Sequence, residues 1–120
     1  MKKKTLVLGA SLNPARYSNL AIKRLVAKSQ PVVAVGLKPG EVAGVKIETE
    51  PKNFEDIHSV TLYLNPRRQV EYYEYILSLH PERVIFNPGT ENPAFFEILQ
   101  KNAIEIEVAC TLVMLSTNQY

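Results

Sequence analysis

The fold is decided by the stretch Thr5-Leu6-Val7-Leu8-Gly9-Ala10-Ser11-Leu12-Asn13-Pro14, which leads into a helical pattern that begins near Tyr17-Ser18-Asn19. A short apolar run, broken by glycine and followed by Ser, Asn and an amphipathic segment, is typical of a nucleotide-binding strand, turn and helix. In such a motif, backbone N–H groups and the helix N-terminus face a phosphate. The stretch therefore predicts a bound anion where the first strand meets its helix.

The length and composition of the chain limit its class. With 120 residues, of which 46% are hydrophobic and 22% charged, it has the usage of a globular protein, and we expect a single domain over residues 1–120. The net charge of +2 is small and the Lys and Arg residues are scattered, which argues against a nucleic-acid partner. No apolar run has the length of a membrane span, and the N-terminus lacks the pattern of a signal peptide. Together with a single cysteine, Cys110, this predicts a cytoplasmic protein with no internal disulfide and no membrane partner.

Apolar segments of two kinds alternate along the chain. Some are strand-length and rich in β-branched or aromatic residues, and several of these are continuously apolar, as in parallel strands covered on both faces. Between them, apolar residues at helical spacing predict helices over 18–29, 66–79 and 93–101, the first with Ser18 as its N-cap. The alternation predicts an α/β fold, a doubly wound and mostly parallel sheet of about five to six strands with helices on both faces. The strand-like segments are 6–8, 32–35, 60–64, 83–86 and 104–108, with 45–47 as a short edge strand.

Four Asn-Pro dipeptides stand at the predicted boundaries of strands and helices. Asn is a good N-cap and Pro is preset for the first helical position, so capping alone accounts for them, at about 1 kcal/mol each. However, the carboxyl ends of the strands also form the ligand crevice of a doubly wound sheet. For Asn13 and for the loop of residues 87–90 we favour ligand contact, whereas for Asn65-Pro66 and Asn92-Pro93 both roles stay open.

The first loop departs from the glycine fingerprint of dinucleotide-binding folds. That fingerprint places glycines at its first, third and sixth positions, where this chain has Gly9, Ser11 and Pro14. A classical NAD site also has a carboxylate at the end of the second strand, whereas Lys38 stands there in this chain. A cation suits a ligand with an additional phosphate on its ribose, which means NADP or coenzyme A (CoA). The alternative for Lys38 is an exposed turn lysine without a ligand.

Blocks along nearly the whole chain resemble the small stand-alone CoA-binding proteins, whose domain is also the N-terminal domain of the succinyl-CoA synthetase α subunit. The blocks are 9–19, 35–36, 61–66, 85–93 and 109–115, and they are specific in combination. The resemblance implies a Rossmann-like CoA-binding fold. The synthetase has a second domain with a phosphorylated histidine, which has no counterpart in this chain, so the resemblance does not imply ligase activity.

The resemblance also implies ligand contacts in four parts of the chain. The pyrophosphate of CoA would be held by the first loop, through Gly9, Ala10, Ser11 and Asn13, with Arg16 reaching a phosphate. Lys38 would lie near the adenosine end. The residues bordering the adenine or the pantetheine would be Leu64, Asn65 and Pro66. The residues flanking the pantetheine arm would be Asn87, Pro88, Gly89 and Thr90.

The remaining reactive residues give little support for catalysis. His58 and His80 lie far apart without a carboxylate at a suggestive spacing, and no cluster has the spacing of metal ligands. Cys110 either packs as a small buried residue or exchanges disulfides with the thiol of CoA. We therefore predict that the chain binds CoA or an acyl-CoA as a non-catalytic carrier, sensor or partner subunit. A small NADP-dependent reductase and a protein-interaction module with a vestigial crevice are the alternatives, and a homodimer or a protein partner is compatible with the prediction.

Overall fold

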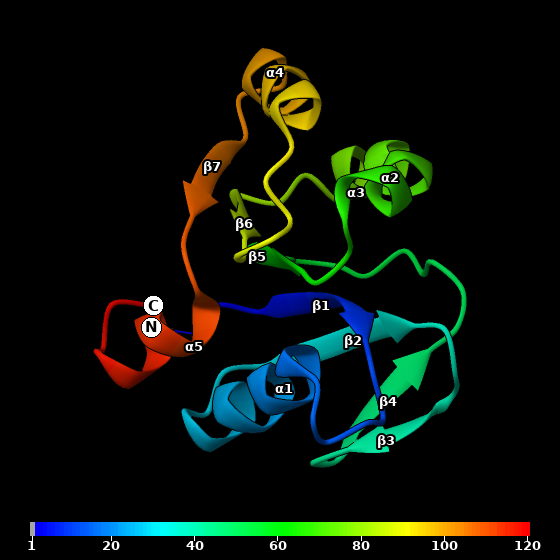
Figure 1. Cartoon of the computed structure of the whole chain (residues 1–120), viewed down its shortest axis with the longest axis vertical. Coiled ribbons are helices and arrows are strands. Elements are labelled where there is room, and N and C mark those ends of the chain that lie inside the picture. The colour runs from blue at the N-terminus through cyan, green and yellow to red at the C-terminus, as the bar shows by residue number, and fades with distance from the viewer. Residues whose placement is uncertain (1) are drawn as a thin grey trace.

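The computed structural model describes residues 2–120, which form strands and helices, with β2 to β5 following one another between α1 and α2 (Figure 1). The strands are β1 (Thr5–Ala10), β2 (Val32–Gly36), β3 (Gly40–Val42), β4 (Val45–Glu48), β5 (Ser59–Leu62), β6 (Arg83–Phe86) and β7 (Glu105–Val108). The helical segments are α1 (Tyr17–Ala27), α2 (Pro66–Gln69), the 3-10 segment η1 (Val70–Tyr72), α3 (Tyr73–Leu79), α4 (Pro93–Lys101) and α5 (Thr111–Ser116). No described helix is long and apolar enough to cross a membrane.

All seven strands form one sheet in the order β3-β4-β2-β1-β5-β6-β7. The pair β3–β4 is antiparallel, and the other five neighbouring pairs are parallel. The six strands of the parallel part, numbered along the chain, have the order 3-2-1-4-5-6 of the Rossmann fold. The chain winds outward from β1 to β4 and then returns to β5 on the other side of β1. This confirms the predicted α/β class and places a topological switch point between β1 and β5.

Helices cover both faces of the sheet, as predicted (Figure 1). On one face, Ile76 of α3 and Phe95 and Leu99 of α4 pack in the cluster that contains Leu6 and Leu8 of β1. On the other face, residues of α1 and α5 pack in the cluster that contains Val7 of β1. Because alternate residues of β1 enter opposite clusters, this central strand is buried on both sides.

The sheet has seven strands rather than five to six, because residues 40–48 form a hairpin. The stretch was irregular in sequence, with only 45–47 predicted as a strand. In the structure, β3 and β4 pair around a turn in which Ala43 and Gly44 have positive φ angles of 51° and 82°. The strand β4 then pairs with β2 in parallel and extends the sheet at that edge.

Two of the helix starts are capped as predicted and one is not. The side chains of Asn65 and Asn92 accept hydrogen bonds from backbone N–H groups of α2 and α4, each with a proline in the first turn. By contrast, Ser18 was wrongly predicted as the cap of α1, because that helix begins one residue earlier, after Arg16. The Arg16 side chain does not cap it. The predicted helix over 66–79 is divided into α2, η1 and α3.

Candidate functional site

A cleft of about 730 Å³ opens at the carboxyl ends of β1, β2 and β5. This is the switch point of the sheet, where ligands of doubly wound folds bind. The first loop and the start of α1 form one wall, the end of β2 forms a second, and α2 with η1 forms a third. The lining residues are Gly9, Ala10, Ser11, Leu12, Asn13, Ala15, Arg16, Tyr17, Ser18, Val35, Gly36, Leu37, Lys38, Tyr63, Leu64, Arg68 and Tyr72.

Two glycines give the floor of the cleft its shape. Gly9 has a φ of +95°, and a Cβ atom there would lie 2.8 Å from the backbone oxygen of Tyr63. A Cβ atom at Gly36 would lie only 2.2 Å from the backbone oxygen of Ala10. The pairing of β1 with β2 shifts register between Leu8 and Ala10, at the same place. Glycine at both positions therefore lets the ends of three strands approach closely and turns the chain out into the first loop.

The first loop is held rigid by its own side chains. Ser11 accepts a hydrogen bond at its Oγ from the N–H of Asn13, and Asn13 accepts one at its Oδ1 from the N–H of Ala15. From α1, Asn19, which is only 2% exposed, donates from its Nδ2 to the carbonyl oxygen of Ser11 at 2.9 Å. These bonds fix the loop without using the N–H groups of its outer part.

Several backbone N–H groups at the cleft have no acceptor within residues 2–120. Four of them lie in the first loop and at the start of α1, at Ser11, Leu12, Tyr17 and Ser18. The last two are in the first turn of α1, which lacks a capping side chain, whereas α2 and α4 are both capped by Asn. Unpaired N–H groups at a helix N-terminus, with the positive end of the helix dipole, form an anion-binding site.

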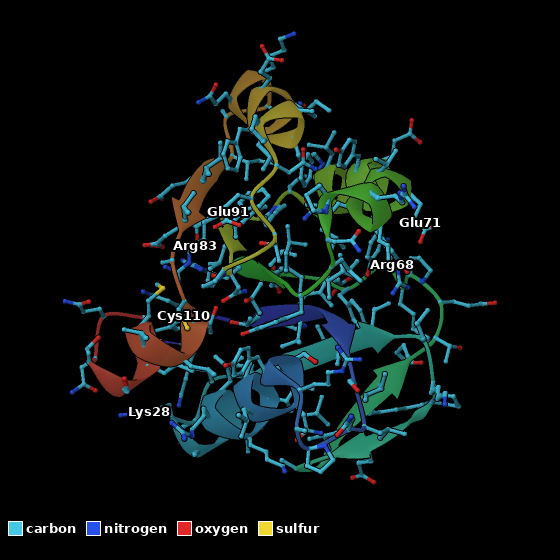
Figure 2. All side chains as sticks on the ribbon, viewed as in Figure 1. Lys28, Arg68, Glu71, Arg83, Glu91 and Cys110 are labelled. Atoms are coloured by element: carbon cyan, nitrogen blue, oxygen red, sulfur yellow. The ribbon has the colours of Figure 1, made fainter. Side chains whose placement is uncertain are left out.

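The charged side chains of the cleft are all cationic. Arg16, Lys38 and Arg68 reach it from the start of α1, the end of β2 and α2, respectively. No Asp or Glu is among the lining residues that the structure describes. In the view of Figure 2, Arg68 lies on the same side as α2, whereas Cys110 lies beside α5 on the opposite side. The site is therefore positively charged on three sides, as a ligand with several phosphates requires.

The structure brings seven of the predicted site residues together in this cleft. These are Gly9, Ala10, Ser11, Asn13, Arg16, Lys38 and Leu64. Asn65 and Pro66 instead start α2, where the Asn65 side chain caps the helix. Asn87, Pro88, Gly89 and Thr90 follow β6 and are not part of the cleft lining. Their predicted contact with a ligand stays a prediction.

Asn87 occupies a buried position between three elements. Its Nδ2 donates to Thr61 Oγ1 at 2.7 Å and to the carbonyl oxygen of Leu62 at 2.9 Å. Its Oδ1 accepts from the N–H of Thr111 at 2.9 Å. The side chain thereby joins β5, the end of β6 and the start of α5.

The third wall is formed by Arg68 and Tyr72, which were not among the predicted site residues. The two residues are four positions apart in the helical segment that follows β5, so they lie on the same side of that segment. The sequence signal was available in Arg67-Arg68, directly after the predicted strand end at Asn65-Pro66. Tyr63, directly after β5, also lines the cleft while packing against the core. Burial raises the pKa of Tyr63 to about 12, so its hydroxyl stays protonated at neutral pH.

Other reactive groups lie outside the cleft lining. His58 precedes β5 and contacts Glu82 at the opposite end of the sheet, and His80 ends α3. Cys110 is partly buried before α5. Within residues 2–120, no cluster of His, Cys, Asp and Glu could hold a metal ion.

Comparison with known proteins agrees with the geometry of this cleft. A protein-family model described as a CoA binding domain matches residues 3–116. The chain belongs to this family. No curated protein gave a significant match.

Solved structures share the whole fold. A crystal structure described as that of an uncharacterized protein is 50% identical, with a TM-score of 0.97 over 100% of this chain and 99% of that one. A hypothetical protein from Pyrococcus horikoshii OT3 is 28% identical, with a TM-score of 0.86 over 97% of this chain and 83% of that one. A conserved hypothetical protein from Pyrococcus furiosus is 26% identical, with a TM-score of 0.77 over 89% of this chain and 92% of that one.

Proposed function

We propose that this chain binds CoA or an acyl-CoA in the cleft, as a non-catalytic carrier, sensor or partner subunit. The observation that carries the proposal is the cradle of four unpaired N–H groups, at Ser11, Leu12, Tyr17 and Ser18, at a cleft where the lining that the structure describes has three cations and no carboxylate. The diphosphate of CoA matches this cradle, since N–H groups and a helix N-terminus bind phosphate oxygens. Membership of the CoA-binding family supports the same ligand.

Lys38 supports a ligand with a phosphorylated ribose. It follows β2, where NAD-binding folds carry an acidic residue that bonds the ribose hydroxyls. CoA carries a phosphate on the 3′ oxygen of its ribose, and the exposed ammonium group of Lys38 would pair with this phosphate. NADP also has a phosphorylated ribose, so it is the ligand against which CoA must be compared.

The groups at the cleft favour binding over catalysis. Arg16, Lys38 and Arg68 bind anions, and the cleft lining that the structure describes contains no His, Asp, Glu or Cys that could act as a general base. Tyr63, with a pKa of about 12, is a poor base at neutral pH. A carrier, sensor or partner subunit needs only the affinity that these groups supply.

Calorimetric titration with CoA, dephospho-CoA, NADP and NAD tests the proposal. CoA should bind tightest, and removal of its 3′-phosphate should weaken binding by about tenfold, because one charge-assisted hydrogen bond contributes about 1–2 kcal/mol. Tighter binding of NADP than of CoA would favour the reductase alternative. Binding of none of the four ligands would favour an interaction module. Mass spectrometry of the freshly purified protein under non-denaturing conditions provides an independent check for retained CoA.

A further inference from the structure

The polar groups of the site are divided unevenly between the two sides of the switch point. The four N–H groups of the cradle, Arg16 and Lys38 lie around the ends of β1 and β2, whereas Arg68 and the unpaired hydroxyl of Tyr63 follow β5. A ligand that crosses a doubly wound sheet continues over the ends of the strands beyond the switch point, here β5 and β6. For CoA, with its diphosphate on the cradle and its phosphorylated ribose at Lys38, the part that continues there is the pantetheine arm.

At the edge that the arm would cross, the side chains of Asn87 and Thr90 are already hydrogen-bonded within the protein. Both ends of the Asn87 side chain are bonded, to Thr61, Leu62 and Thr111. The Thr90 hydroxyl donates to the carbonyl oxygen of Asn87, which also accepts from the N–H of Thr90.

The N–H groups of the loop after β6 are also unavailable. Gly89 donates its N–H to the Glu91 carboxylate at 2.8 Å, Thr90 donates its N–H within the loop, and Pro88 has none. Residues 88–90 therefore offer no free N–H to the carbonyl oxygens of a pantetheine. The first loop differs in this respect, since it leaves its outer N–H groups free.

Next to this edge, the side chain of Gln69 is fully buried and forms hydrogen bonds through both its Nε2 and its Oε1. Its Nε2 donates to the carbonyl oxygens of Leu64 and Thr90, and its Oε1 accepts from Asn92 Nδ2. Asn92 also donates to the hydroxyl of Tyr73. This network closes the gap between α2 and the start of α4, so no polar group of Gln69 or Asn92 faces a ligand.

A pantetheine arm contains two amide groups. Buried without partners, each would lose its hydration at a substantial cost, whereas an arm in solvent keeps it. Because the groups described above are already bonded, none of them is available to replace that hydration.

We propose that the cleft recognises the 3′-phospho-ADP part of CoA alone and leaves the pantetheine arm, the thiol and any acyl group in solvent. The inference rests on the proposed function and specifies its ligand class as CoA thioesters of any acyl group. The residues 87–90 then flank the arm without bonding it and serve to join β5, β6 and α5. The protein holds the nucleotide end and presents the thioester to a partner.

Titration of one protein sample with a set of ligands tests the proposal. CoA, acetyl-CoA, succinyl-CoA and octanoyl-CoA should have dissociation constants within about threefold of one another, and free 3′-phospho-ADP should bind within about tenfold of CoA. A difference of more than about tenfold among the thioesters would overturn the inference, as would failure of 3′-phospho-ADP to compete with CoA. In both cases CoA would still bind, so the proposed function would survive. If CoA itself does not bind, both fail. If 3′-phospho-ADP bound more than about tenfold tighter than CoA, the site would be that of a free nucleotide and both would be overturned.

The reactivity of the bound thiol gives a second readout. Cys110 is the sole cysteine of the chain, so the Cys110→Ser variant leaves the thiol of CoA as the only one in the sample. With this variant in excess, bound CoA should react with the thiol reagent DTNB within about twofold of the rate of free CoA, since reaction needs only an accessible thiolate. Protection by more than about tenfold would show a buried arm and overturn the inference.

A pair of variants completes the test. Lys38→Ala should weaken the binding of CoA and of 3′-phospho-ADP by the same factor. Glu91→Ala frees the N–H of Gly89 at the edge crossed by the arm, and it should change the affinity for CoA by less than about twofold. A loss of more than about tenfold on Glu91→Ala would place a binding group in this loop and contradict the inference.

Discussion

Gly36 and Ala10 approach so closely that a Cβ atom at Gly36 would lie 2.2 Å from the carbonyl oxygen of Ala10. This contact joins the ends of β2 and β1 under the cleft, where the first loop begins. The backbone of Ala10 cannot move away without displacing the cradle of N–H groups that follows it. The packing of two strand ends and the shape of the anion site are therefore one structural feature.

Replacing Gly36 by Ala should damage both stability and binding. We expect Gly36→Ala to lower the free energy of unfolding by about 2–3 kcal/mol, as overpacking against backbone does, and to weaken CoA by at least about tenfold in the folded protein. Urea unfolding and calorimetry measure the two effects. Gly44→Ala is the matched control, because its Cβ would meet nothing within 4 Å and only its positive φ adds strain. A Gly36→Ala variant with unchanged CoA affinity would contradict the coupling.

Lys38 should distinguish CoA from dephospho-CoA. Lys38→Ala should weaken CoA by about 1–2 kcal/mol, the contribution of a partly exposed charge-assisted hydrogen bond, and leave dephospho-CoA nearly unchanged. Calorimetry with both ligands measures the difference. Lys46→Ala, which removes an exposed lysine of β4 outside the cleft, should bind both ligands as the unmodified chain does. Equal losses of affinity for the two ligands would show that Lys38 does not contact the 3′-phosphate.

Arg68 should contribute to CoA binding, whereas the neighbouring Arg67 should not. Arg68→Gln removes a cation from the cleft but keeps the backbone N–H that donates to Asn65, so α2 retains its cap. We expect CoA to bind about tenfold more weakly and with a smaller dependence on salt, as expected for loss of a phosphate contact. Arg67→Gln changes the same charge on an exposed residue outside the cleft lining, and its affinity should stay within about twofold. Similar losses in both variants would indicate a general charge effect.

The sequence was sufficient to locate the first wall of the site. The stretch from Gly9 to Arg16 could be interpreted because strand, turn and helix are consecutive, so their geometry depends on local residues alone. The strand-like segments and the α/β class followed from periodicity for the same reason. Lys38 could be included because it ends the second strand of a motif whose chain order is fixed.

The third wall could not be found in this way. Arg68 enters the cleft only because β5 pairs with β1 rather than with β4, and this order is decided by packing over the whole sheet. In the hairpin β3–β4, the strand at 45–47 was predicted, but β3 was missed because it is three residues long and lies among turn residues. Asn87 lies at the predicted ligand-binding edge of the sheet. However, the sequence does not show that its side chain points into the protein and forms hydrogen bonds with Thr61 and Thr111.

The His58 imidazole should make the protein less stable in mild acid. Partial burial lowers the pKa of His58 below its ordinary value of 6.5. The carboxylates of Glu82 and Glu105 oppose this shift, whereas the cations Arg83 and Lys3 add to it. The unfolded chain therefore binds a proton more readily than the folded chain, and stability falls as the pH drops below about 6.5. Urea unfolding between about pH 7 and pH 5 should show this slope, and His58→Gln should reduce it. His80→Asn, which replaces the other histidine in its left-handed position, should keep the slope. A slope that is lost with His80 instead would refute the assignment.

Replacing Asn87 should lower the stability of the protein without changing its affinity for CoA. Asn87→Ala leaves the buried N–H of Thr111 without its acceptor and removes two bonds to β5, so the free energy of unfolding should fall by about 2–4 kcal/mol. Below its unfolding temperature the variant should bind CoA within about twofold of the unmodified chain, because the cleft lies on the other side of β5. Asn102→Ala, which removes one exposed bond to Ile98, should cost less than about 1 kcal/mol. If Asn87→Ala kept its stability and lost CoA instead, the amide would be a ligand contact, and the loop of residues 87–90 would be part of the binding site.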